Sequence, residues 1–219
     1  MYVTASGEEF PYTPREMAEL CGVYYLYDDD HYPPGKRPQI EIIVHRYRKN
    51  FLLSLIVSCS LIDTMEIVFN FRSNNISINL LVSSGEEKDI AARVMNFMRV
   101  RARKEGFQLV TLKAHKSDKP LILPKFPYKR YFWSGYITWG KVGFLFLDDK
   151  DRKKFLDMVK NYEDYNSEMT MLHHLLATQK GTNYWVTEGY KWEGFYDFTN
   201  PTCNEILTNY LQRKGLRYA

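Results

Sequence analysis

Apolar and polar residues alternate along much of the first third of the chain. The alternation has the two-residue period of a half-buried β-strand in residues 40–44, 51–57, 64–71 and 76–82. Basic residues at 45–50 separate the first two segments and are typical of a hairpin turn. The pattern therefore predicts several consecutive antiparallel strands with one face toward a core.

A helix and a further strand follow the last of these segments. After a charged turn at 83–89, apolar residues recur at helical spacing from Ile90 onward, and Gly106 closes the helix. Residues 109–112 then form a short apolar strand. Because a strand, a helix and a strand of these lengths pack as a crossover between parallel strands, segment 76–114 predicts the centre of a mixed, mainly antiparallel sheet.

Helix signals also stand near both ends of the chain. Pro14 suits the first position of a short helix that Gly22 ends, and residues 23–27 then predict a brief strand. At the other end, Pro201 begins a helix that Gly215 closes. The sequence thus predicts one helix before the strands and one at the end.

Between the central segment and the last helix the signals change several times. Three prolines between 120 and 127 exclude an ordinary helix and predict an extended, exposed basic loop. Residues 131–147 have strand character, helices are predicted at 150–161 and then up to residue 179, and an aromatic strand at 184–198. The glycines expected at bends of the first of these segments are Gly135, Gly140 and Gly143.

The shift from strands to helices near residue 148 divides the chain into two parts. Residues 1–148 are expected to form a mixed α/β domain, in the broad α/β (α+β) class, and residues 149–219 a C-terminal helical and aromatic extension. The extension packs on the same core or forms a subdomain of its own, and the sequence leaves both arrangements open.

The composition is that of a soluble globular protein. Of 219 residues, 45% are hydrophobic and 26% are charged, so the chain is long enough to bury a core. Three cysteines without C-x-x-C spacing indicate neither a disulfide framework nor a zinc site, and no secretory signal pattern opens the sequence. The longest apolar run, 51–62, is too short for a membrane helix. We therefore expect a cytoplasmic protein that does not contact a membrane.

Positive charge is concentrated in one stretch. The net charge is +4, but eleven Lys or Arg stand against two acids between Arg93 and Arg130. This asymmetry suggests an anionic partner, which is a phosphorylated cofactor, nucleic acid or an acidic protein. Alternatively, a solvated helix face followed by a basic loop would give the same excess of positive charge without any partner. The 17 tyrosines likewise suit either a pocket or interface, or a Tyr-rich core.

Patterns for other chemistries are weak. Acidic residues and a histidine at 28–31 are consecutive, so their side chains point in different directions and predict a solvated turn rather than a metal site. His173 and His174 face about 100° apart on a helix and do not form the i, i+4 pair of a zinc protease. The sequence contains no G-x-S-x-G, Walker or G-x-G-x-x-G motif.

The segment from Asp89 to Ala114 resembles the central motif of the GNAT superfamily of acyl-CoA-dependent N-acetyltransferases. In that family a strand leads into a turn at the N-terminus of a long helix, and backbone N–H groups of this turn hold the pyrophosphate of acetyl-CoA. Helix 90–104, the closing Gly106 and strand 108–112 have the length and the apolar placement that the family shows.

The resemblance implies acetyl-CoA as cofactor and an amine as acceptor. It places the cofactor contacts at Leu81, Val82, Lys88, Asp89, Ile90 and Ala91. Backbone N–H groups of strand 80–83 would hold the oxygen charge of the reacting thioester. Members often carry a tyrosine, three further residues, a glycine and an aromatic residue, and Tyr131 before Gly135 fits that spacing as the general acid for the CoA thiolate. Tyr190 before Gly194 has the same spacing but lies farther from the strand.

The expected phosphate turn departs from the family pattern. The family favours a basic residue or Gln, two spacers, a glycine, one spacer, and glycine or alanine. Here Ala91 fits, whereas Glu86 replaces the basic residue or Gln and Asp89 replaces the glycine. Carboxylates oppose an anionic ligand but are also favourable at a helix N-terminus. Two hypotheses result: a divergent GNAT-like acyltransferase, or a non-catalytic protein that binds nucleic acid or an acidic protein through the basic aromatic loop 113–133.

Overall fold

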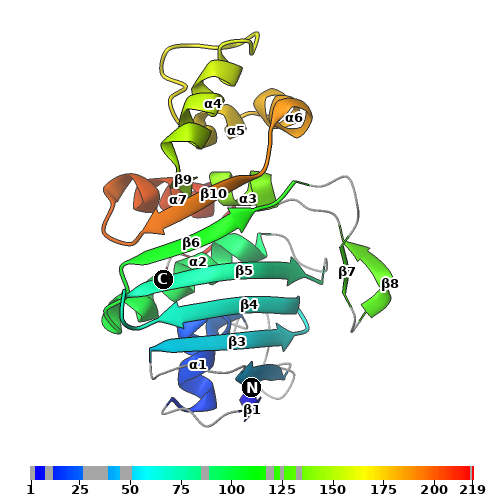
Figure 1. The fold of residues 1–219 in the computed structure, drawn as a ribbon, viewed down its shortest axis with the longest axis vertical. Coiled ribbons are helices and arrows are strands. Elements are labelled where there is room, and N and C mark those ends of the chain that lie inside the picture. Colours follow the sequence, from blue (N-terminus) through cyan, green and yellow to red (C-terminus); the bar gives the residue numbers. More distant parts are fainter. Residues whose placement is uncertain are drawn as a thin grey trace. The chain divides into compact units, whose positions relative to one another are not determined.

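The protein is described by a computed structural model, which shows an α/β chain with a mixed sheet (Figure 1). The described residues are 3–7, 12–26, 39–44, 51–84, 89–116, 121–123, 126–131, 135–217 and 219, and between 121 and 131 only the backbone is described. The chain folds as two compact units. The first comprises Met1–Val110, Asp197–Thr199 and Leu211–Ala219, and the second Thr111–Tyr196 and Asn200–Tyr210. The domain boundary expected near residue 148 stays a prediction.

Successive strands of the first unit are neighbours in its sheet. They are β1 (Val3–Gly7), β2 (Ile40–Val44), β3 (Leu52–Cys59), β4 (Ile62–Asn70) and β5 (Asn75–Ser83). β1 is parallel to β2, and the later neighbours are antiparallel. Burial alternates along β2, β3 and β4, as a half-buried strand requires. The predicted series of antiparallel strands is confirmed, while the turn at 45–50 lies outside the described residues.

A long helix connects β5 to the next strand. This helix is α2 (Ile90–Lys104), and the strand is β6 (Leu109–Ala114), whose first residues belong to the first unit. β5 and β6 are neighbours, and their arrows point the same way in Figure 1. Gly106, at φ 84°, ends α2, and the Phe107 N–H bonds to the Ala102 carbonyl at 2.9 Å. The predicted strand, helix and strand are confirmed.

Helices cover one face of the first unit's sheet. α1 (Pro14–Leu20) and α2 lie behind the strands in Figure 1. α1 begins with a capping box between Thr13 and Glu16 and ends at Gly22, at φ 73°, as the sequence predicts. The largest fully buried side chains of this unit are Phe69, Phe198, Leu20, Leu26, Ile40, Ile42 and Leu53.

The prediction of a strand at 23–27 is wrong. Residues Tyr24–Leu26 form a 3₁₀ helix, η1. The Val23 N–H bonds to the Ala18 carbonyl at the end of α1, and the Leu26 N–H bonds back to the Val23 carbonyl. Both bonds keep the backbone turning, so the β-propensity of the tyrosines is overridden.

The second unit combines short strands with helices. β6 neighbours β10 (Trp192–Asp197), and β10 is antiparallel to β9 (Leu145–Phe146). β7 (Leu121–Leu123) and β8 (Phe126–Tyr131) form a separate antiparallel hairpin, so the proline-rich segment is extended as predicted, although it is paired. The helices are α3 (Gly135–Lys141), α4 (Asp149–Val159), α5 (Leu172–Leu176), α6 (Gln179–Glu188) and most of α7 (Pro201–Arg213).

The prediction of strand structure at 131–147 is wrong for most of that range, because α3 lies there. Gly140 is a packing residue rather than a bend. A Cβ added to it would lie 2.7 Å from the Leu172 side chain, so the glycine allows close approach of α5. Gly143, at φ 98°, stands after the helix, and the Phe144 N–H closes it onto the Trp139 carbonyl.

The helix predicted up to residue 179 is shorter than expected, and a second helix follows where a strand was predicted. α5 ends at Leu176, and the Thr178 hydroxyl begins α6 by accepting the Gly181 N–H at 3.0 Å. α6 continues to Glu188, so the strand predicted from residue 184 begins only at Trp192. The predicted helices at α4 and α7 are confirmed.

Aromatic side chains form the core of the second unit. The Tyr136 carbonyl accepts a hydrogen bond from the indole N–H of Trp185 and another from that of Trp192, each at 3.0 Å. Other buried rings of this core are Phe144, Phe155, Tyr162 and Tyr196. In this unit the aromatic excess therefore builds a core, and the polar tips of the indoles are satisfied inside it.

Candidate functional site

The candidate cofactor site begins at the end of β5. Val82 is buried and Leu81 is partly exposed on the opposite face, and they lie opposite Thr64 and Met65 of β4. The pairing of β4 with β5 shifts register twice, and Asn79 is the extra residue on β5 at one of these bulges. A bulge bends its strand and changes the direction of the backbone groups beyond it.

The N-terminus of α2 carries an unusual backbone conformation. Asp89 is the N-cap residue, with φ 65° and ψ 20°, in the left-handed region that glycine favours. Its side chain does not cap the helix. Ile90 and Ala91 follow with buried side chains. Lys88 and the turn at 85–88 lie outside the described residues.

This helix end is suited to an anion. The first N–H groups of an α-helix have no acceptor within the helix, and the macrodipole makes this end positive. α2 has no acidic residue in its first turn, and basic residues stand in its last turn. The carboxylate of Asp89, which opposes an anion, lies 3.8 Å from the Lys214 ammonium, and this cation offsets part of its charge.

The polar side of α2 is used inside the first unit. Arg93 is buried and donates to the Leu26 carbonyl at 2.7 Å. Asn96 and Arg99 are also buried and bond to the main chain at the C-terminal end of the chain. Arg93 and Arg99 are buried and donate to main-chain carbonyls of the protein itself, so they do not form an exposed basic face.

An ion cluster joins the end of α2 to α1. Arg101 lies 2.7 Å from Glu105, 3.3 Å from Glu19 and 3.8 Å from Glu16. The Tyr12 hydroxyl donates to Glu105 at 3.0 Å, and burial together with this carboxylate raises the pKa of Tyr12 to about 12. The cluster therefore joins α1 to the end of α2 within the first unit.

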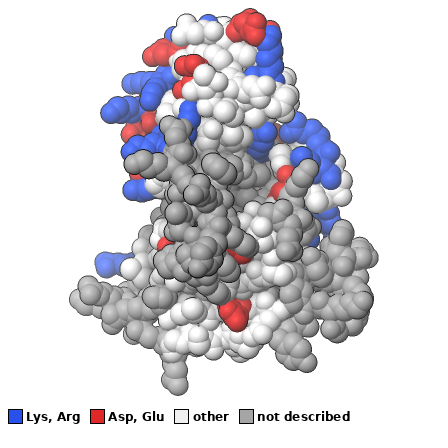
Figure 2. All heavy atoms as spheres, turned by 90° about the vertical axis from the view of Figure 1, so that its right-hand side faces the viewer, with Lys and Arg blue, Asp and Glu red and all other residues white. Residues whose placement is uncertain are grey.

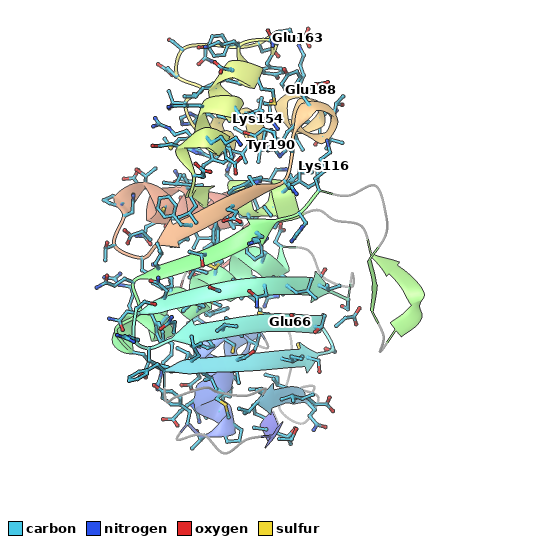
Figure 3. The ribbon with its side chains drawn as sticks, in the orientation of Figure 1. Glu66, Lys116, Lys154, Glu163, Glu188 and Tyr190 are labelled. Atoms are coloured by element: carbon cyan, nitrogen blue, oxygen red, sulfur yellow. The ribbon has the colours of Figure 1, made fainter. Side chains whose placement is uncertain are left out.

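Two cations of the basic loop have partners within the second unit. Lys113 pairs with Glu193 at 3.2 Å. Lys116 donates to the carbonyls of Val186, Thr187 and Gly189 at 2.8 to 3.0 Å (Figure 3), and it thereby caps the end of α6. The other cations of the loop have side chains outside the described residues. Binding of nucleic acid or an acidic protein at 113–133 stays a prediction that depends on them.

The helical surface of the second unit carries both signs of charge. Lys180 pairs with Glu163 and Asp164, and Lys160 pairs with Asp157. Figure 2 shows Lys and Arg beside Asp and Glu in the upper part of the face drawn, where Figure 1 places α4 and α6. The positive bias of segment 93–130 therefore does not continue over these helices.

The two tyrosines with the expected spacing differ. The backbone of Tyr131 lies at the end of β8 opposite Leu121, and its side chain lies outside the described residues. The Tyr190 hydroxyl donates to the Asp151 carbonyl at 2.6 Å, and the Lys154 ammonium lies 3.8 Å from the ring centre (Figure 3). Burial raises the pKa of Tyr190. Tyr190 therefore contacts α4 through both its hydroxyl and its ring.

Other candidate chemistry finds little support. In the described ranges no three His, Cys, Asp or Glu residues are placed to hold a metal ion, and residues 28–31 are outside those ranges. The rings of His173 and His174 lie 4.1 Å apart on α5. Cys21, Cys59 and Cys203 form no disulfide. None of the helices in the described part of the chain has the length and apolar composition needed to cross a membrane.

The geometry at β5 and α2 is the part of the site that sequence reasoning located. No protein-family model matches the chain, and no curated protein sequence does. The resemblance to the GNAT superfamily thus depends on the residues and on the arrangement of β5, α2 and β6.

Sequence reasoning missed the role of the C-terminal residues. Lys214 reaches Asp89, and the main chain of Arg217 and Ala219 bonds to Asn96 of α2. Main-chain contacts do not depend on residue type, so the residues of the C-terminal segment do not indicate them. The available signal was on α2, where polar residues recur three apart, at 93, 96 and 99, in the otherwise apolar stretch 90–100.

Proposed function

We propose that the protein is a divergent GNAT-like acyltransferase that moves an acetyl group from acetyl-CoA to an amine. One observation carries this proposal: β5 leads into a helix N-terminus whose cap, Asp89, has the left-handed backbone of a glycine position, and the parallel neighbour β6 follows the helix. Asp89 stands where the family pattern has a glycine, and its backbone has the left-handed conformation that glycine favours, which supports the proposal.

The chain's own groups have distinct roles in this proposal. Acetyl-CoA supplies the acyl group as an activated thioester. The main-chain N–H groups of Ile90 and Ala91, with Lys88, would bind its pyrophosphate, because they stand at the positive end of the helix dipole. Main-chain groups of Leu81 and Val82 would orient the acyl arm and stabilise oxygen charge as the amine attacks.

The Asp89 carboxylate is the feature that opposes this role, and it gives a direct test. We expect Asp89→Gly to strengthen CoA binding by about tenfold, since one nearby charge and a strained left-handed residue are both removed. Titration calorimetry with CoA measures the change. The free energy of unfolding should rise by about 1 kcal/mol because glycine tolerates φ 65°.

A matched control lies in the turn between β4 and β5. Asn74, at φ 54°, is the other described non-glycine residue with positive φ. Asn74→Gly should give a similar gain in stability with no change in CoA affinity. Equal affinity of wild type and the Asp89→Gly variant would contradict the placement of the pyrophosphate at α2.

The resemblance assigns the general acid to Tyr131. We expect Tyr131→Phe to lower kcat by about tenfold or more, because the departing thiolate loses its proton donor, while CoA binding stays within about twofold. Steady-state kinetics with an amine panel and calorimetry with CoA measure the two effects. Tyr190→Phe serves as the comparison, and its kcat should stay at the wild-type value because Tyr190 has no part in the proposed proton transfer. An unchanged kcat in the Tyr131 variant would remove the assignment.

A further inference from the structure

The C-terminal end of the chain forms a strap along α2. The strap consists of Lys214–Arg217 and Ala219, and all its contacts described below lie within the first unit. Its contacts follow α2 in order: Lys214 at Asp89, Arg217 at Asn96, and Ala219 at Arg99. The N–H groups of Lys214, Gly215 and Leu216 still bond back to the end of α7. The main chain of Arg217 and Ala219 follows them and bonds to Asn96 and Arg99 of α2.

Asn96 holds this strap through the main chain alone. Its amide nitrogen donates to the Arg217 carbonyl at 3.0 Å, and its amide oxygen accepts the Ala219 N–H at 3.2 Å. The carbonyl of one residue and the N–H two residues later point to the same side of an extended chain. The Asn96 amide thus bonds to the strap as the peptide group of a neighbouring β-strand would.

Arg99 completes the grip. Its guanidinium donates to the Ala219 carbonyl at 3.0 Å and lies 3.5 Å from the Asn96 amide oxygen. Asn96 is 1% exposed and Arg99 is 6% exposed, whereas the side chains of Arg217 and Ala219 are exposed. On the α2 side, this contact is buried and polar. The side chains of Arg217 and Ala219 take no part in the hydrogen bonds that form it.

We propose that Asn96 and Arg99 form a docking site for the main chain of an extended peptide, which the chain's own strap fills in cis. Recognition through alternate N–H and C=O groups gives affinity without strict dependence on sequence. Buried polar groups are costly to leave without partners, so the site favours an occupied state and exchanges one extended segment for another. This docking site does not depend on acetyl-CoA binding.

The first part of the test releases the strap in the intact 219-residue chain. Ala219→Pro removes the N–H that Asn96 accepts, and Ala219→Ser keeps it. We expect trypsin to cut after Lys214 and Arg217 at least about tenfold faster in the proline variant, and at the wild-type rate in the serine variant, since local opening governs cleavage. Far-UV circular dichroism should be unchanged. Equal cleavage rates would show that the main chain is not held.

The second part asks whether the vacated site takes a peptide in trans. A fluorescent peptide with the sequence of residues 215–219 should bind the Ala219→Pro variant at least about tenfold more tightly than wild type, because the strap competes at an effective concentration of about millimolar. Methylation of the peptide's last backbone nitrogen should abolish binding, and Arg217→Ala in the peptide should change it less than about threefold. Equal binding of the methylated peptide, or no binding to the opened variant, would overturn the proposal.

Discussion

Replacement of Trp185 by alanine is expected to lower the free energy of unfolding by about 3 to 5 kcal/mol. Trp185 is fully buried in the aromatic core of the second unit, and its ring lies 5.2 Å from that of Tyr190 and 6.0 Å from that of Phe155. The substitution removes a large apolar surface, leaves a cavity, and takes one of two donors from the Tyr136 carbonyl. Urea denaturation followed by tryptophan fluorescence and circular dichroism measures the loss.

Two further variants separate the causes of this effect. Trp185→Phe loses the N–H and part of the indole ring system but keeps one aromatic ring in the core. Its cost should be smaller than that of alanine, because the cavity is smaller and Trp192 still donates to the Tyr136 carbonyl. Val186→Ala changes the next residue of α6, which is 45% exposed, and should alter stability by less than about 0.5 kcal/mol. A loss below 1 kcal/mol for Trp185→Ala would contradict the core described for this unit.

Replacement of Gly22 by alanine is expected to cost about 3 kcal/mol in the first unit. Gly22 ends α1 at φ 73°, a conformation that costs an L-residue about 1 to 2 kcal/mol. A Cβ there would also lie 2.3 Å from the Val94 carbonyl oxygen and 2.9 Å from the Met98 nitrogen. Both atoms belong to the backbone of α2, so relief requires the two helices to separate.

Gly106 provides the matched control for this prediction. It has φ 84° at the end of α2, and nothing lies within 4 Å of a Cβ built on it. Gly106→Ala therefore carries the conformational cost alone and should lower the free energy of unfolding by about 1 kcal/mol. Equal losses in the two variants would show that α1 and α2 do not approach as closely as the structure has them.

The sequence predicted correctly those elements whose ends or faces depend on a few neighbouring residues. Pro14 at the start of α1 and the glycines at 22, 106 and 215, which have positive φ, all stand where the sequence predicts a helix to begin or end. Strand alternation located β2 to β5 because one face of each is buried. In each case a few neighbouring residues carry the whole signal.

Elements that depend on distant contacts were missed. α3 was predicted as a strand because aromatic residues favour strands, but Tyr136 and Trp139 are three apart and both are buried. Gly140 was expected to bend the chain. In the structure a glycine is needed there because α5 packs closely against it. The strap along α2 could not be predicted from the C-terminal residues, because Asn96 bonds to their main chain and not to their side chains. The candidate site was located through β5 and α2, and the left-handed conformation of Asp89 emerged only from the structure.

Titration calorimetry of the wild-type chain with acetyl-CoA tests the central claim most directly. The account predicts binding with a dissociation constant on the order of micromolar. S-acetylpantetheine, which lacks the pyrophosphate, should bind at least about tenfold more weakly, because the contacts at the α2 N-terminus are lost. Absence of heat with acetyl-CoA at high protein concentration, or equal binding of the two compounds, would contradict the acyltransferase proposal.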